Sequence, residues 1–208
     1  MPASPWQAAS RTDIAATNGI RFSSRTSVPK CKPALTNLSA AKMQESGPKS
    51  TAVTAAVIRT PIGPLDIESV GESAVCRISF HSRGRPTPGS LTGLLAELAR
   101  QLDAYFAGRL ETFDLPLAPA GTPFQQDVWR MLLQIPYGRT WTYSDLARRI
   151  GRPDAVRAVG AANGANPIPI VIPCHRVIGT NGKLVGFGGG LETKQRLLLL
   201  ESGQQALL

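Results

Sequence analysis

The sequence lacks any long apolar run. Its 208 residues contain no uninterrupted hydrophobic stretch near the roughly 20 residues that a membrane-spanning helix needs, and its clean apolar runs are short ones such as Leu197 to Leu200. The first 50 residues also lack the continuous apolar segment of a secretory signal. We therefore expect no membrane span and no membrane partner.

Cysteine and histidine are scarce. The three cysteines, Cys31, Cys76 and Cys174, are widely spaced without a CxxC pair, and His81 and His175 are the two histidines. This pattern predicts neither a disulfide framework nor a zinc ribbon, so we expect no metal site. It is typical of a reducing compartment, and we expect a cytoplasmic protein, or a nuclear one in a eukaryote. His81 is expected to be a solvated surface residue.

Acidic residues are too few to balance the basic ones, and the net charge is +9. The first 50 residues carry seven Lys or Arg against two acids, whereas residues 51–208 carry 16 against 12. Because the larger part of the chain is only mildly basic, nucleic-acid binding has to be argued from a site and not from the total charge.

Residues 1–50 mix Ser, Thr, Pro and Ala with scattered basic residues and show no sustained apolar period. The composition fits disorder, a transit peptide or a nonspecific basic arm. We favour a disordered basic extension.

Residues 51–118 predict a small α/β domain. Three segments have the apolar pattern of strands, at residues 51–58, 65–70 and 74–80, with a turn at residues 61–64. Ser90 is expected to cap a helix whose apolar residues recur every three or four positions up to a stop at Gly108. One such helix can cover one face of a small antiparallel sheet.

Residues 119–208 predict a mostly helical domain. Thr122, Pro123 and Gln125 form a capping-box signature with proline at the first helical position, for a helix that should end near residues 137–138. The same signature recurs at residues 142–145 and opens a short helix through Ile150.

A second short helix is expected from Asp154 to about Ala162, beyond a stop at Gly151. Two short helices across a tight turn predict a helix-turn-helix. The second helix consists almost wholly of small residues around one long cation, Arg157. This suits shape and phosphate contact in the minor groove better than base reading, and it suits a tight helix–helix interface equally well. Further candidate phosphate contacts are Arg148, Arg149 and Arg152.

One stretch, residues 166–179, places a thiol and an imidazole side by side after a proline-stiffened apolar run. Three prolines within residues 166–173 exclude an ordinary helix and predict an extended path. Cys174 can be inert packing, but a reactive thiolate needs a base nearby, and His175 is the candidate. Because neighbours on a strand point to opposite faces, we expect the proton to pass through a water.

The PCHRV motif at residues 173–177, with Asn166 and the helix-turn-helix before it and Glu201 after it, resembles the O6-alkylguanine-DNA alkyltransferase family. The resemblance covers roughly residues 51–203. It implies an α/β (α+β) protein, in which a small ribonuclease-like domain precedes a winged helix-turn-helix domain that carries the active site. It further implies a monomeric, single-turnover enzyme without cofactor, which irreversibly transfers the O6-alkyl group of guanine in double-stranded DNA to a cysteine, with O4-alkylthymine as a second substrate.

The resemblance implies catalytic roles for five residues. Cys174 would accept the alkyl group, His175 would act as general base through a water, and Glu201 would orient that imidazole. Asn166 would brace the turn at the active site. Tyr143 would hydrogen-bond the guanine and supply a proton to it.

The resemblance also implies the DNA and base contacts. Arg157 would enter the duplex in place of the flipped nucleotide. The small helix surface against the minor groove would be formed by Ala155, Val156, Ala158 and Gly160. Arg176 is a further candidate phosphate contact because of its charge. The substrate pocket would be lined by Tyr143, Val177, Gly186, Phe187 and Gly188, with the glycine-rich segment as a lid.

Two alternatives stay open beside this interpretation. A noncatalytic, lesion-binding helix-turn-helix protein resembles the same domain but lacks the acceptor cysteine, so the presence of Cys174 argues against it. A Cys–His hydrolase would need a base from elsewhere in the chain and an oxyanion hole, and the sequence has no such signature.

Overall fold

The computed structural model describes residues 53–80, 84, 86–87 and 91–203. Three expectations concern residues outside these ranges: the disordered basic extension, a solvated position for His81, and Ser90 as a helix cap. No helix in the described ranges is long and apolar enough to cross a membrane. Nor do the same ranges contain a group of three or more His, Cys, Asp or Glu that is placed to hold a metal ion.

The first half of the described chain forms a three-stranded antiparallel sheet in the order β1-β2-β3. Its strands are β1 (Val53–Ile58), β2 (Leu65–Val70) and β3 (Ala74–Ser79). The turn between β1 and β2 contains Gly63 at a φ of 106°, where a side chain would be strained. Alternate residues of β2 are buried, which confirms the predicted period of two.

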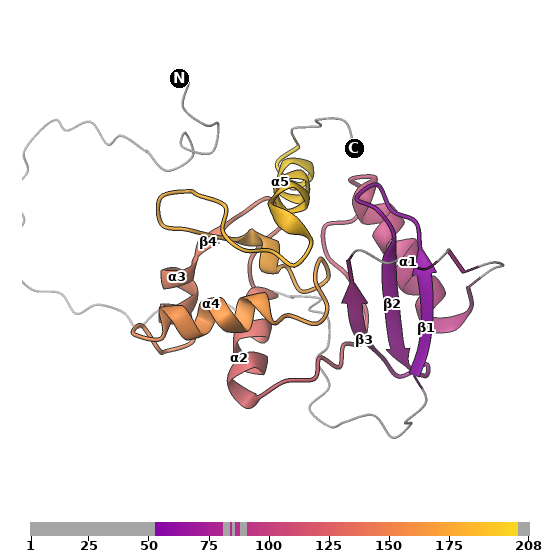
Figure 1. Ribbon diagram of the computed structural model, residues 1–208, viewed down its shortest axis with the longest axis horizontal. Helices are drawn as coiled ribbons and strands as arrows, with labels where there is room; N and C mark the ends of the chain where they lie inside the picture. Colours follow the sequence, from indigo (N-terminus) through magenta and orange to yellow (C-terminus); the bar gives the residue numbers. More distant parts are fainter. Residues whose placement is uncertain (1–52, 81–83, 85, 88–90, 204–208) are drawn as a thin grey trace, which may run out of the picture. The chain divides into compact units, whose positions relative to one another are not determined.

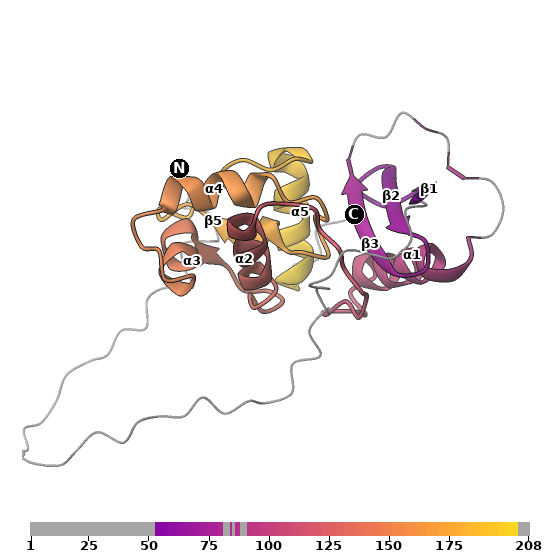
Figure 2. The same ribbon diagram turned by 90° about the horizontal axis from the view of Figure 1, so that it is seen from below.

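Helix α1 (Gly93–Phe106) lies along one face of this sheet (Figures 1 and 2). Its N-cap is Thr92, so the prediction that Ser90 caps the helix was wrong. The expected stop was correct: Ala107 is the C-cap, and Gly108 follows it with a φ of 67°. The side chains that α1 buries are Leu94, Leu95, Leu98, Gln101, Leu102, Tyr105 and Phe106.

Helix α2 (Pro123–Leu132) begins with the predicted capping box between Thr122 and Gln125. It ends at Leu132, earlier than the predicted residues 137–138. Gln134 and Ile135 instead donate to carbonyls only three residues back. Ile135 precedes Pro136, which disfavours helical backbone at that residue, and the helix cannot continue.

The helix-turn-helix consists of α3 (Tyr143–Arg149) and α4 (Val156–Gly164). The capping box of Thr142 and Asp145 opens α3, and Gly151 makes the turn at a φ of 72°. Helix α4 begins two residues later than predicted. The turn in which Ala155 N donates to Arg152 O occupies that part of the chain. Helix α4 packs against both α2 and α3 (Figure 1).

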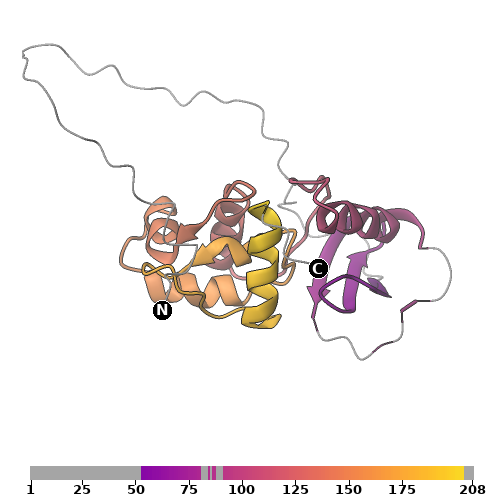
Figure 3. The same cartoon turned by 90° about the horizontal axis from the view of Figure 1, so that it is seen from above.

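A short parallel ladder joins β4 (Trp141–Thr142) to β5 (Val177–Ile178), and the sequence analysis did not predict it. Helix α5 (Gly190–Glu201) then packs against the segment that precedes β5 (Figure 3). A small antiparallel sheet with one helix, followed by a mostly helical unit, confirms the predicted α+β class.

Candidate active site

The segment before Cys174 is a tight turn, so the predicted extended path was wrong. Pro169 and Ile172 form an isolated bridge, and Ile170 between them is buried with a φ of 74°. Left-handed backbone at a β-branched residue costs about 1–3 kcal/mol and persists only where its surroundings enforce it. Asn166 supplies that support: its Nδ2 donates to Ile172 O over 2.8 Å, and its Oδ1 accepts from Ile168 N over 3.0 Å.

Cys174 begins a single 3-10 turn, Cys174–Arg176, and does not lie on a strand. The premise that Cys174 and His175 point to opposite faces of a strand therefore fails. Cys174 is 5% exposed, and its backbone carbonyl accepts from Asn163 Nδ2 over 3.4 Å. A strained turn on one side and a 3-10 turn on the other thus hold the thiol in one position.

His175 is fully buried and bonded to the end of α5. Its Nε2 lies 2.7 Å from Glu201 Oε1, and its Nδ1 has no hydrogen-bond partner in the described part of the chain. A carboxylate only accepts, so Nε2 carries the proton and Nδ1 carries the lone pair. Burial lowers the pKa of His175, although Glu201 opposes that effect. The imidazole is therefore neutral at pH 7 and can act as a base through Nδ1.

Glu201 is the centre of a buried hydrogen-bond network. Arg176 donates to it from Nε over 2.8 Å and from Nη2 over 3.0 Å, and the Tyr105 hydroxyl donates over 2.7 Å. Burial alone would raise the pKa of Glu201, but His175 and Arg176 lower it to about 2. The carboxylate is therefore charged and fixed, which is what an imidazole-orienting group requires.

The structure corrects the expected role of Arg176. Its guanidinium is buried, pairs with Glu201 and donates from Nη1 to Ile135 O over 2.6 Å. A group held in this way is not available to a DNA phosphate. Tyr105, which the sequence suggested only as a core residue of α1, proves to be part of the same network.

Lys194 is a buried cation that the sequence analysis missed. Its Nζ donates to Val177 O over 2.7 Å and to Val185 O over 2.8 Å. Burial lowers its pKa to about 8, while the nearby Cys174 works against that shift. Its position in α5 resembles that of any solvated lysine, so only the folded packing could find it.

Burial has the largest effect on the pKa of the Cys174 thiol. Burial raises its pKa to about 11, although a bond from Asn166 and the charge of Lys194 both act to lower it. The resting thiol is therefore protonated at neutral pH. A reaction at this sulfur needs a base at the moment of attack, and His175 is adjacent in the chain.

Two cavities meet at the residues expected to form the lid. The base cavity, of about 500 Å³, is lined by Tyr143, Val156, Gly160, Asn163, Gly164 and residues 185–188. The more enclosed thiol cavity, of about 210 Å³, is lined by Cys174, Asn166, Asn163, Gly164, Pro169, residues 78–80 and residues 186–188. Val177 lines neither cavity and is fully buried, which corrects its expected place in the pocket.

Tyr143 lies in the base cavity at the start of α3. Burial raises the pKa of its hydroxyl, the neighbouring Cys174 raises it further, and Asn163 lowers it. The hydroxyl therefore remains protonated and can donate. Gly160 of α4 faces this ring, because a Cβ at that position would lie 3.8 Å from the Tyr143 ring atoms.

The outer surface of α4 presents small residues around Arg157. Arg157 and Ala158 are exposed, whereas Ala155, Val156 and Gly160 are partly buried. Val156 and Gly160 also line the base cavity, so one helix joins the small-residue surface to the pocket. Contact of this surface with DNA stays a prediction.

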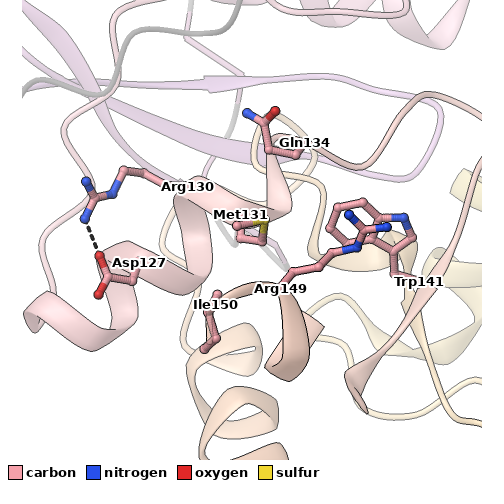
Figure 4. Close-up of a pocket in the computed structure, with 7 residues that line it drawn as sticks. All are labelled: Asp127, Arg130, Met131, Gln134, Trp141, Arg149 and Ile150. Atoms are coloured by element: carbon pink, nitrogen blue, oxygen red, sulfur yellow. Dashed lines mark hydrogen bonds and ion pairs between the residues drawn. The ribbon is translucent and has the colours of Figure 1, made fainter. Parts of the chain in front are cut away.

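A third cavity, of about 750 Å³, contains none of the expected catalytic or pocket residues, but it is lined by Arg149, one of the candidate phosphate contacts (Figure 4). In it the guanidinium of Arg149 stacks over the Trp141 ring at 3.9 Å from the centroid, and Arg130 pairs with Asp127. Arg148 pairs with Asp145. Phosphate contact by Arg148, Arg149 and Arg152 stays a prediction.

The fold and the site together define a class: a helix-turn-helix protein with a buried thiol beside a neutral, carboxylate-oriented imidazole. Two family models match the chain. The 6-O-methylguanine DNA methyltransferase ribonuclease-like domain matches residues 53–119, and the DNA binding domain of the same description matches residues 123–203. The chain belongs to the 6-O-methylguanine DNA methyltransferase family.

Individual relatives agree with this assignment. A methylated-DNA–protein-cysteine methyltransferase of Methanosarcina barkeri is 62% identical over 105 residues, which are 50% of this chain and 66% of that protein. One of Methanosarcina acetivorans is 48% identical over 151 residues, 70% of this chain and 96% of that protein. A crystal structure of Mycobacterium tuberculosis OGT in complex with DNA is 46% identical with a TM-score of 0.65, and the match covers 72% of this chain and 93% of that one.

Proposed function

We propose that this chain repairs alkylated DNA by moving the O6-alkyl group of guanine irreversibly onto Cys174, once per molecule. The observation that carries the assignment is the buried thiol in a partly enclosed cavity, next to a neutral His175 oriented by Glu201. Methyl transfer from methylated DNA to a protein cysteine is the activity that the names of its relatives state. The O6 position of guanine is the first expected substrate site, and the O4 position of thymine is the second.

The thiol proton passes to Nδ1 of His175 through a water, since that nitrogen has its lone pair free in the described chain. The Cys174 thiolate then attacks the alkyl carbon. The S–C bond forms as the C–O6 bond breaks, and its electron pair stays on the guanine. The departing base takes up a proton, for which the protonated Tyr143 hydroxyl is placed in the base cavity. Proton loss at sulfur and proton gain at the base balance, so the reaction needs no cofactor.

The base must leave the stacked duplex to reach this thiol, at a cost of a few kcal/mol. Exposed Arg157 on the small-residue surface of α4 supplies the group that fills the vacated position. The exposed Ala158 lets the duplex approach closely, and the base cavity receives the flipped guanine. Double-stranded DNA containing O6-alkylguanine is thus the proposed partner, and we expect a monomer to bind it.

We also propose how the chain is divided into domains. Residues 51–118 form a domain that supports the site, residues 119–208 form the helix-turn-helix alkyltransferase domain, and residues 1–50 are a basic extension outside both.

The test is intact-mass analysis of the full chain after incubation with a duplex that carries one O6-methylguanine. We expect one added methyl per molecule, and peptide mapping should find it on Cys174. Cys174→Ala should abolish the adduct. Cys76→Ala is the matched control, since Cys76 is a partly exposed thiol on β3, and it should react as wild type.

Turnover beyond one methyl per chain, or an adduct on Cys76, would overturn the proposal. Tight binding to the lesion without any adduct would favour the noncatalytic alternative.

A further inference from the structure

The base cavity and the thiol cavity share Asn163, Gly164 and the residues 186–188, but only the thiol cavity contains Cys174. In O6-alkylguanine the base and the alkyl group are joined at one oxygen. A guanine in the base cavity with O6 toward the thiol therefore directs its alkyl group into the thiol cavity. Whatever forms the far wall of that cavity limits the size of the alkyl group.

That wall comes from the end of β3, in the half of the chain that matches the ribonuclease-like domain. Ile78, Ser79 and Phe80 line the thiol cavity. The backbone of Ile78 is fixed to the segment that leads into Cys174, because Ile78 N donates to Pro167 O over 2.9 Å. The wall therefore keeps its place relative to Cys174.

The Phe80 ring is held against the lid. It packs on the Phe187 ring with centroids 5.2 Å apart and an interplanar angle of 59°. A Cβ at Gly189 would lie 3.0 Å from the Phe80 ring and 3.1 Å from the Phe187 ring. A side chain at residue 189 would therefore crowd both rings.

We propose that Phe80 is a specificity-determining residue for the alkyl group, and that its ring sets the largest group the thiol cavity admits. The cavity volume of about 210 Å³ exceeds what a methyl group fills, and none of its lining residues carries a charge. The substrates it suits are therefore uncharged alkyl and arylmethyl groups. This inference rests on the proposed transfer to Cys174.

The test compares two duplexes that differ only in carrying O6-methylguanine or O6-benzylguanine. Single-turnover rate constants are measured by the mass of the Cys174 adduct. Phe80→Trp narrows the cavity, and we expect the benzyl rate to fall about tenfold while the methyl rate stays within about threefold, because one misfitting group in an apolar pocket changes rates on that scale. Phe80→Ala should raise the ratio of the benzyl rate to the methyl rate.

Phe124→Ala is the matched control, since Phe124 is also a partly buried phenylalanine but lies on α2 and lines neither cavity. It should leave the ratio of the two rates unchanged. If each Phe80 variant changed the methyl rate and the benzyl rate by the same factor, the inference would be overturned, because the ring would then only support the lid. A wild-type chain that forms no Cys174 adduct with either duplex would overturn the proposed function as well.

Discussion

Lys194 illustrates how a single side chain adjusts the chemistry of its neighbour. Burial alone makes the Cys174 thiolate unfavourable, and the ammonium of Lys194 offsets part of that penalty through its charge. The same ammonium bonds the carbonyls of Val177 and Val185, on either side of residues 178–184. With a pKa of about 8, Lys194 is mostly protonated at pH 7 and loses this charge above pH 8.

Replacing Lys194 by methionine should therefore raise the pKa of Cys174 and slow alkylation about tenfold at pH 7, the change that one pKa unit represents. In the wild type, the increase of rate with pH should become shallower above about pH 8, where Lys194 is neutralised. The Lys194→Met variant should show no such change of slope near pH 8. Rates with free O6-benzylguanine between pH 6 and 10 measure both effects. Lys183→Met, at an exposed lysine, is the control, and an equal loss there would refute the role.

Residue types suggested the Cys174–His175 pair because the two side chains are adjacent in the sequence, and its catalytic role stays a prediction. They failed where the partner comes from far along the chain. Tyr105 and Glu201 are 96 positions apart, and Arg176 looks like any surface arginine until Glu201 is placed beside it. Burial, and not residue identity, decides what such a side chain does.

At the scale of elements, capping signals located the helix starts correctly for α2 and α3, because each capping box is complete within four residues. Helix ends and short pairings were less predictable. Helix α2 stops where Pro136 disfavours helical backbone, and the β4–β5 ladder pairs residues about 36 positions apart in the sequence, counting from Trp141 to Val177. The turn at Ile170 depends on Asn166, which no periodicity reveals.

Helix α4 provides a test of base flipping. Arg157→Ala should lower the rate of repair in duplex DNA by about tenfold or more, because extruding a base costs a few kcal/mol and the arginine offsets part of that cost. The rate with free O6-benzylguanine, which needs no extrusion, should stay within about twofold of wild type. Arg109→Ala, an exposed arginine just after α1, serves as the control and should leave both rates unchanged. Equal losses of Arg157→Ala on both substrates would contradict the proposed role.

At the scale of the whole molecule, the buried carboxylate of Glu201 connects α1, the 3-10 turn Cys174–Arg176 and α5. Removing one partner of a buried ion pair commonly costs 3–5 kcal/mol, since the other charge is left without compensation. The network that we propose to orient His175 is therefore also a determinant of stability.

Stability should consequently fall in acid in two steps. His175 has a folded pKa below its ordinary value of 6.5, and Glu201 has a folded pKa of about 2 against an ordinary 4.5. Between the folded pKa and the ordinary pKa of each group, the unfolded chain binds more protons than the folded chain. The free energy of unfolding therefore decreases as pH falls, first below about 6.5 and then below about 4.5. The Glu201 step amounts to about 3 kcal/mol at 1.36 kcal/mol per pKa unit.

Urea unfolding between pH 8 and pH 3 measures these steps. Glu201→Gln should be less stable at pH 7, and its difference from wild type should shrink below pH 4.5. Glu192→Gln, at an exposed acid of the same helix, should keep the wild-type profile. A pH-independent difference for Glu201→Gln would rule out this linkage.

The hydrogen bond from Tyr105 to Glu201 also makes the chain a candidate for a split reporter. A cut in the connection between α1 and α2 would leave Tyr105 on one fragment and the whole Cys174–His175–Glu201 set on the other. The catalytic carboxylate would regain this donor, and the thiol cavity its wall at residues 78–80, only when the fragments associate. Covalent labelling of Cys174 would then leave a permanent record of that association.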